Sequence, residues 1–229
     1  MCYNKEISLY TYIIGLVSSY LLLNNDKPSL KILGCFFIIV IHMQLIDFFL
    51  WSNNKCNNIN IKISTVGAFL NFIQPIILYL AILYYNKDIK NENKKKINII
   101  ILIYIIILFL YCMNLFPLNC SIVTQKSFPY LQWSWYYKYV PNYLLTILII
   151  LPISLFLLMY FGLDKPYNLY LSLILMLSFI ISFIIYKNKK TFLNMWCWFT
   201  EFILIIILVI DKFFISFEKY KNIKIVKHK

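Results

Sequence analysis

The sequence contains no arginine, and all 22 of its basic residues are lysine, against only 9 acidic residues. Arginine is the side chain that binds phosphate and guanine through a bidentate fork, so its absence argues against a nucleic-acid partner. The formal net charge of +13 is better explained by lysines in loops, which orient helices in a membrane.

Histidine is scarce as well: the chain has only His42 and His228, and it has no CxxC pair. Membrane hydrolases of the ceramidase and adiponectin-receptor type hold zinc with three histidines, so their site cannot be built here. A cysteine-based metal site needs closely spaced cysteines. We therefore expect neither a metal nor another cofactor.

Markers of other membrane-protein classes are also missing. A retinal-binding rhodopsin needs a lysine midway along its seventh helix, whereas Lys212 lies in the last turns of the seventh apolar run. The DRY-type and NPxxY motifs of G-protein-coupled receptors do not occur, and the 4 glycines form no phosphate-binding loop.

Apolar residues are abundant and make up 62% of the chain, compared with roughly 45–50% in a soluble domain. A helix needs about 17 to 25 mostly apolar residues to span a bilayer, and seven such runs occur. We expect an all-α transmembrane bundle in a single integral membrane domain, residues 1–229. Because the first run lacks a small-residue cleavage site, we expect it to be retained. The predicted helices are 7–23, 30–51, 63–85, 97–116, 139–161, 167–186 and 195–214.

The positions of the lysines predict the orientation of these helices. Counted loop by loop, 8 lysines fall on the side of the N-terminus and 14 on the other side. The positive-inside rule then places the N-terminus outside and the C-terminus, with its basic tail 212–229, in the cytosol. The lysines of the loop 187–190 count against this orientation.

Two further features fall on the predicted outer side. All five tryptophans lie at that interface, where indole rings favour the headgroup region. Cys56 and Cys120 lie in outer loops, where the compartment permits a disulfide, and they either bond to each other or remain two free thiols. Asn119 begins a formal glycosylation sequon, which overlaps the candidate disulfide.

Polar side chains inside three of the predicted spans define a candidate site. A carboxylate in hydrocarbon costs about 2.5–3.5 kcal/mol, so Asp47 should face other helices or water. At a rise of about 1.5 Å per residue, Asp47 lies about one turn below the outer surface, and Asn71 and Gln74 lie about 12–17 Å below it. Glu201 lies about two turns into the last helix. The whole cluster consists of Asp47, Glu201, Gln44, Asn71, Gln74 and His42.

Two residues, His42 in this cluster and Pro75 beside it, lead to separate expectations. His42 lies on a different helix face from Gln44, and we expect it to hydrogen-bond between helices instead of binding a ligand. Pro75 has no backbone N–H and should free a carbonyl near the depth of Gln74.

The cluster has a functional and a structural interpretation. If the three helices are neighbours, the polar groups form a pocket that opens to the outside. Two close carboxylates, Asp47 and Glu201, would push one pKa up and share a proton, which suits an ion path, a small-molecule site or acid-pair hydrolysis. Alternatively, the polar side chains only pin the helices together, at about 0.6 kcal/mol per contact.

Three short motifs carry a family resemblance. They are MQLIDFFLW at residues 43–51, the pair Gln74-Pro75, and NMWCWF at residues 194–199. This pattern resembles an uncharacterised family of multi-pass membrane proteins of giant DNA viruses and some protists. The resemblance implies that Asp47 stands at the family's acidic position and that the polar faces are its distinctive part, but it implies no activity.

Three functions follow as hypotheses. The first is a transporter, channel or small-molecule-binding protein, and the second is a membrane-embedded lipid hydrolase that uses the Asp/Glu pair. The third is a structural protein of a viral or organellar membrane. Of these hypotheses, the enzyme is the less favoured one. The expected partner is the lipid bilayer of an endomembrane, plasma membrane or virion, with anionic lipid at the lysine-rich tail.

Overall fold

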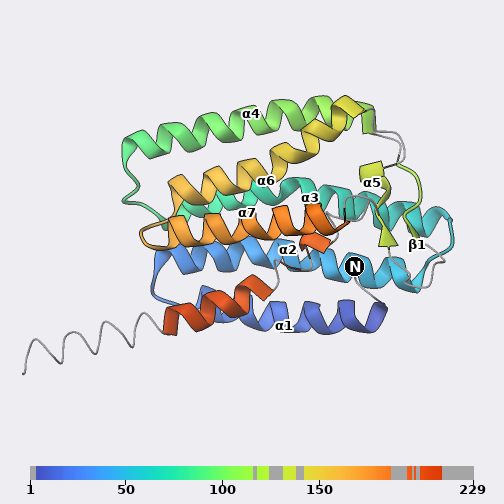
Figure 1. Cartoon of the computed structure of the whole chain (residues 1–229), viewed down its shortest axis with the longest axis horizontal. Coiled ribbons are helices and arrows are strands. Elements are labelled where there is room, and N and C mark those ends of the chain that lie inside the picture. The colour runs from blue at the N-terminus through green and yellow to red at the C-terminus, as the bar shows by residue number, and fades with distance from the viewer. Residues whose placement is uncertain are drawn as a thin grey trace, which may run out of the picture.

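The computed structural model describes residues 4–115, 118–123, 131–137, 142–186, 195–197, 199 and 202–212. This part of the chain folds as a bundle of long helices that run alongside one another (Figure 1). Five of the described helices are long and apolar enough to cross a membrane, and the predicted all-α bundle is confirmed. The long helices are α1 (Lys5–Leu23), α2 (Pro28–Ser52), α3 (Asn58–Tyr85), α4 (Asn91–Leu115), α6 (Asn142–Gly162) and α7 (Tyr167–Tyr186).

Several helices begin earlier than their apolar runs, because polar residues cap their first turns. The Asn4 side chain accepts a hydrogen bond from the Ile7 amide at 2.8 Å and so starts α1. The Asn57 side chain accepts one from Asn60 at 2.9 Å and starts α3 five residues before the predicted position. Such caps satisfy amide groups that have no partner within the helix.

The start of α4 corrects the predicted loop between the third and fourth helices. Residues 91–96 are helical, although their charges suggested a break. Glu92 and Lys96 are one helical turn apart and form an ion pair, a spacing that supports a solvent-exposed turn of helix. Charge therefore ended the apolar span here but did not end the helix.

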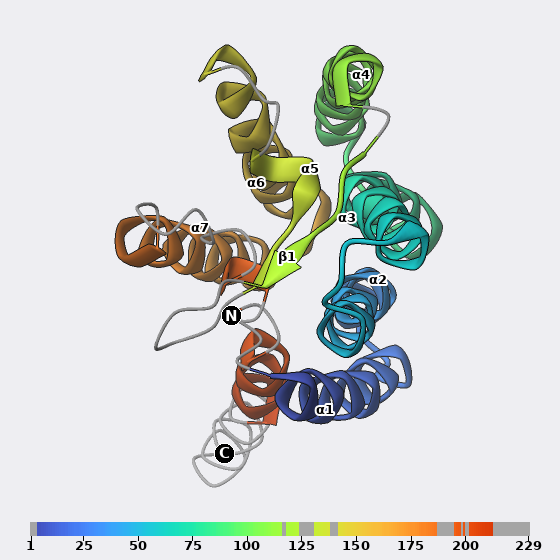
Figure 2. The same cartoon turned by 90° about the vertical axis from the view of Figure 1, so that its right-hand side faces the viewer.

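The helices follow one another around the bundle, as the end-on view shows (Figure 2). Helix α2 packs against both α1 and α3, while α6 contacts α3, α4 and α7. Of the most apolar stretch of α2, 61% is buried, compared with 22% for α4. Helix α2 is therefore the most buried of the five candidate spans, and the polar residues on its buried face meet protein.

Close backbone contact joins α1 to α2 at Gly34. A Cβ atom on Gly34 would lie 2.9 Å from the Leu23 amide nitrogen and 3.0 Å from the Ser19 carbonyl oxygen. Small residues that let backbones approach are typical of helix contacts in membranes, where van der Waals packing drives association.

The connector between α4 and α6 lies across one end of the bundle (Figure 2). It contains the antiparallel strands β1 (Ile122–Val123) and β2 (Leu131–Gln132), followed by the single turn α5 (Ser134–Tyr137). At this end Cys56 and Cys120 form a disulfide, which settles the choice left open by the sequence. We call it the disulfide end. Asn119, the candidate glycosylation residue, is half-buried beside the bond.

The disulfide predicts a simple labelling result. Denatured protein treated with a maleimide should gain two more labels after reduction than before it, because reduction releases Cys56 and Cys120. Cys56→Ser and Cys120→Ser should each abolish this gain, while Cys112→Ser should retain it. Mass spectrometry of the intact chain counts the labels, and an equal count before and after reduction of the unmutated protein would contradict the bond.

Candidate polar site inside the bundle

Asp47 is completely buried in α2, and its partner comes from the connector. The indole N–H of Trp133 donates a hydrogen bond of 2.6 Å to Asp47 Oδ1. Trp133 stacks on Trp135 with ring centroids 5.0 Å apart, and both rings are buried. Because both the carboxyl group and the indole are buried, loss of this hydrogen bond would leave polar atoms unpaired there, and the contact attaches the connector to the core of the bundle.

The position of Gly67 in α3 makes room for this insertion. A Cβ atom there would lie 2.7 Å from the Trp135 ring and 2.8 Å from Ile46. Any larger residue would therefore push the second tryptophan out or separate α2 from α3. The missing side chain at Gly67 thus admits an aromatic ring between α2 and α3.

A second set of hydrogen bonds attaches the connector to α3. Ser64 and Ser121 join through their hydroxyl groups at 2.7 Å. The Asn60 side chain accepts from the Ser121 amide at 2.9 Å and donates to the Ser121 carbonyl at 3.1 Å. All three residues are buried, and the Tyr111 hydroxyl donates to the Trp135 carbonyl. The disulfide end is thus closed by a buried polar network.

Gln44 and His42 face α1 instead of α3. The Thr11 hydroxyl donates to Gln44 Oε1 at 3.3 Å. His42 Nδ1 lies 2.6 Å from the Ile38 carbonyl of its own helix, and its ring meets the Tyr12 ring edge-on at 5.5 Å. The expected hydrogen bond of His42 is therefore made within α2, and its contact between helices is aromatic.

Gln74 lies at a cavity where several helices meet. It is 2% exposed, and its amide nitrogen has no hydrogen-bond partner in the described part of the chain. The cavity measures about 10 Å³, about the space that one water molecule needs. Its other walls come from α2, α6, α7 and the segment 195–197: Phe36, Val40, Leu155, Leu175, Trp196 and Cys197.

Pro75 interrupts the hydrogen bonding of α3 directly beside Gln74. The Tyr104 hydroxyl of α4 donates to the Phe72 carbonyl at 2.7 Å, close to the point where proline removes an N–H donor. A side chain from a neighbouring helix thus satisfies a backbone group near the interruption, as membrane helices require. The N–H that Pro75 lacks would have bonded the Asn71 carbonyl, so Tyr104 contacts the carbonyl next to that position.

The predicted cluster is distributed over three surroundings instead of one pocket. Gln44 contacts α1, Asp47 contacts the connector, and Gln74 faces the cavity. Asn71 is buried on the same helix as Gln74, and Glu201 lies outside the described residues. Two of the three resemblance motifs, Gln74-Pro75 and Trp196-Cys197, share the Gln74 cavity.

A polar network at the opposite end of the bundle was missed by the sequence reasoning. Lys27 Nζ donates to Asp211 Oδ1 at 2.7 Å and to the Tyr167 hydroxyl at 2.9 Å. Tyr167 in turn donates to Asp211 at 2.6 Å, and Asn25 donates to the same carboxylate at 3.2 Å. Burial lowers the pKa of Lys27, but these contacts outweigh it and raise its pKa above the usual value, so Lys27 is charged at neutral pH.

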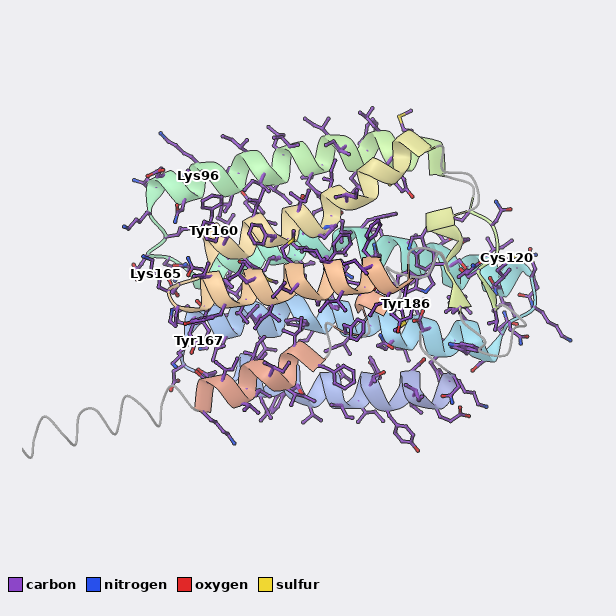
Figure 3. All side chains as sticks on the ribbon, in the orientation of Figure 1. Lys96, Cys120, Tyr160, Lys165, Tyr167 and Tyr186 are labelled. Carbon is purple, nitrogen blue, oxygen red and sulfur yellow. A yellow bond between two sulfur atoms is a disulfide. The ribbon has the colours of Figure 1, made fainter. Side chains whose placement is uncertain are left out.

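A second group completes this network. The Ser29 hydroxyl donates to Asp164 at 2.9 Å and accepts from the Asp164 amide at 2.9 Å. Asn86 donates to the Gly162 carbonyl at 2.9 Å and to Asp164 at 3.3 Å. These bonds join the first turn of α2 and the loop before α7 to the end of α3. Figure 3 shows Lys165 and Tyr167 at this end, away from Cys120.

A repeated tripeptide could have signalled this region. Asp-Lys-Pro occurs at 26–28 and again at 164–166, each time directly before a long helix. Proline favours the first turn of a helix, and the two copies mark the starts of α2 and α7 at the same end of the bundle. We call this side of the bundle the DKP end.

Removing the indole donor at Asp47 should destabilise the protein. Trp133→Phe keeps an aromatic ring but leaves a buried carboxylate oxygen without this bond, which costs about 1–3 kcal/mol. The double variant Trp133→Phe/Asp47→Asn should recover part of the loss, because a neutral amide costs less to bury than a charge. Thermal unfolding in detergent measures both effects.

Trp51→Phe is the matched control for this experiment. The Trp51 indole nitrogen has no hydrogen-bond partner in the described part of the chain, so its loss should change stability much less. Equal losses from the two tryptophan substitutions would contradict the importance of the Trp133–Asp47 bond.

Comparison of the chain with protein-family models, with curated proteins and with solved structures finds no match.

Proposed function

We propose that this multi-pass membrane protein is a channel or transporter for a proton or small cation, and that the Gln74 cavity lies on its path. The observation that carries the proposal is the buried Gln74 amide, which faces a water-sized cavity without a hydrogen-bond partner in the described part of the chain. A buried, unsatisfied donor costs about 1–3 kcal/mol. A water molecule in the cavity would remove that cost.

The size of the cavity favours a proton or a small ion over a larger solute. About 10 Å³ admits one water molecule and no organic substrate. A proton can move along hydrogen-bonded waters and polar side chains, and such relays in membrane proteins pass through buried polar and ionisable residues. Asp47 supplies a carboxylate on α2, and Glu201 remains a predicted second acid.

Prolines inside two of the helices next to the cavity support the same proposal. Pro75 follows Gln74 directly, and Pro152 lies inside α6, one turn before the cavity residue Leu155. Transporter sites are commonly formed where membrane helices are discontinuous, near the middle of the bilayer. Both α3 and α6 continue through their prolines, but each lacks one backbone N–H donor close to the cavity.

A structural role in a membrane is the second candidate, and the Asp47 contact favours it. Asp47 holds Trp133, so its carboxylate acts as an anchor for the connector. This hydrogen bond explains why a buried carboxyl group is present at position 47 without giving it a role in transport. The lipid-hydrolase hypothesis needs a second acid within reach of Asp47, and its expected partner Glu201 lies outside the described residues.

The orientation of the helices and the identity of the membrane that holds them also belong to this proposal. Lysine counts place the DKP end in the cytosol, and the disulfide suits an oxidising compartment at the opposite end. The basic tail would then meet anionic lipid of the inner leaflet. The resemblance to viral and protist membrane proteins favours an endomembrane, plasma membrane or virion membrane.

Flux measurements in proteoliposomes test the proposal. The unmutated protein should dissipate an imposed proton, sodium or potassium gradient, and Gln74→Leu should reduce that flux at least about tenfold. The same substitution should not lower thermal stability, because the Gln74 amide nitrogen has no hydrogen-bond partner to lose in the described part of the chain. Loss of flux at undiminished stability therefore separates a functional amide from a structural one.

Asn98→Leu provides the matched control, because Asn98 is an exposed amide on α4. It should leave the flux unchanged. A flux that survives Gln74→Leu, or a well-folded protein that passes none of the three ions, would overturn the proposal.

A further inference from the structure

The two Asp-Lys-Pro turns enclose a pocket that is much larger than the cavity at Gln74. It measures about 360 Å³ and is lined by residues 27–29 from one turn and 164–167 from the other. This volume lies within the range of about 300–1,000 Å³ that is common for small-ligand sites. The pocket lies where α2 and α7 begin, at the level where membrane spans meet the headgroup region.

The pocket presents both signs of charge. Lys27 supplies a partly exposed ammonium group that is already held by Asp211 and Tyr167. Lys165 is exposed and shares the wall. Asp164 is also exposed, although its carboxylate accepts from Ser29 and Asn86. A carboxylate has about four acceptor positions, so Asp164 retains capacity for a further donor.

The apolar parts of the wall suit a lipid rather than a free solute. Pro28 and Pro166 line the pocket together with Tyr167, and the Lys27 ammonium lies 5.5 Å from the centre of the Tyr167 ring. An amphipathic ligand would place its charged head against the lysines and Asp164. Its acyl chains would extend along the lipid-facing side of the bundle.

We propose that this pocket binds the headgroup of a zwitterionic aminophospholipid, phosphatidylethanolamine being the simplest example. Its phosphate would accept hydrogen bonds from Lys165 and Lys27, and its ammonium would donate to Asp164. Phosphatidylcholine offers the same charges but no N–H donor, and phosphatidylglycerol offers the phosphate without the amine. The inference is independent of the ion path, because no residue lines both the pocket and the Gln74 cavity.

Native mass spectrometry of the full chain tests the proposal. Protein in detergent is mixed with equal amounts of phosphatidylethanolamine, phosphatidylcholine and phosphatidylglycerol, and the retained lipid is identified by mass. We expect phosphatidylethanolamine to be retained about tenfold better than either competitor. Asp164→Asn and Lys165→Ala should each reduce this preference about threefold or more.

Two substitutions at the same end of the bundle serve as matched controls. Asp88→Asn and Lys95→Ala make the same changes of charge at exposed positions outside the pocket, and both should leave the preference intact. Equal losses in the controls would show a general charge effect and overturn the site. Retained preference in Asp164→Asn and Lys165→Ala would overturn it too.

The competition among the three phospholipids also identifies the chemistry of the headgroup. A preference for phosphatidylglycerol would show a purely anionic site and overturn the zwitterionic assignment. Soluble phosphoethanolamine, added at the same concentration in place of the lipid, distinguishes a headgroup from a free metabolite. Weak binding of the soluble compound supports a lipid ligand, whereas binding as strong as that of the lipid overturns it.

Discussion

In the hydrocarbon core of a bilayer, a buried polar group finds its partner in the protein or in a water-filled space. Asp47 shows how strongly this requirement shapes the chain. Its carboxylate lies on the most buried helix, α2, and lipid cannot solvate it. The protein meets the requirement by bringing the Trp133 indole N–H into the bundle, and the rest of the connector follows from that insertion.

The connector is arranged around this contact. For Trp133 to reach Asp47, the chain after α4 must turn inward across the end of the bundle, and the β1–β2 pair makes that turn. Trp135 then needs the space left by Gly67. The disulfide between Cys56 and Cys120 holds the start of the connector to the loop before α3. One buried carboxyl group and its hydrogen bond thus explain the course of this segment.

The sequence predicted what depends on local chemistry and left open what depends on distant contacts. Apolar length located the helices, and α7 has the predicted bounds of 167–186. The starts of α3 and α4 were missed because asparagine caps and an ion pair extend helices into polar sequence. Such extensions need no apolar residue, so hydropathy does not detect them.

The candidate site shows the same limit more clearly. Four members of the predicted cluster, Gln44, Asp47, Asn71 and Gln74, are buried, but depth alone does not say which helix a side chain faces. Gln44 and Asp47 are three residues apart, yet one contacts Thr11 of α1 and the other contacts Trp133. These partners are 33 and 86 residues away in the sequence, so their positions depend on the packing of the whole bundle.

The two ends of the bundle differ in what holds them together, and this difference bears on how the protein can move. At the disulfide end, a covalent bond and buried hydrogen bonds join the connector to α2 and α3.

At the DKP end, the loops are joined by a partly exposed ion pair and hydrogen bonds around an open pocket. Lys27 in this ion pair is partly exposed, and regions with exposed contacts open at lower free-energy cost than buried ones. Motion that widens the Gln74 cavity should therefore start at the DKP end, where α2 and α7 begin, while the disulfide end remains fixed. A lipid headgroup seated between the two turns would hold both helix starts at once, which places the proposed lipid site at the point where such motion is controlled.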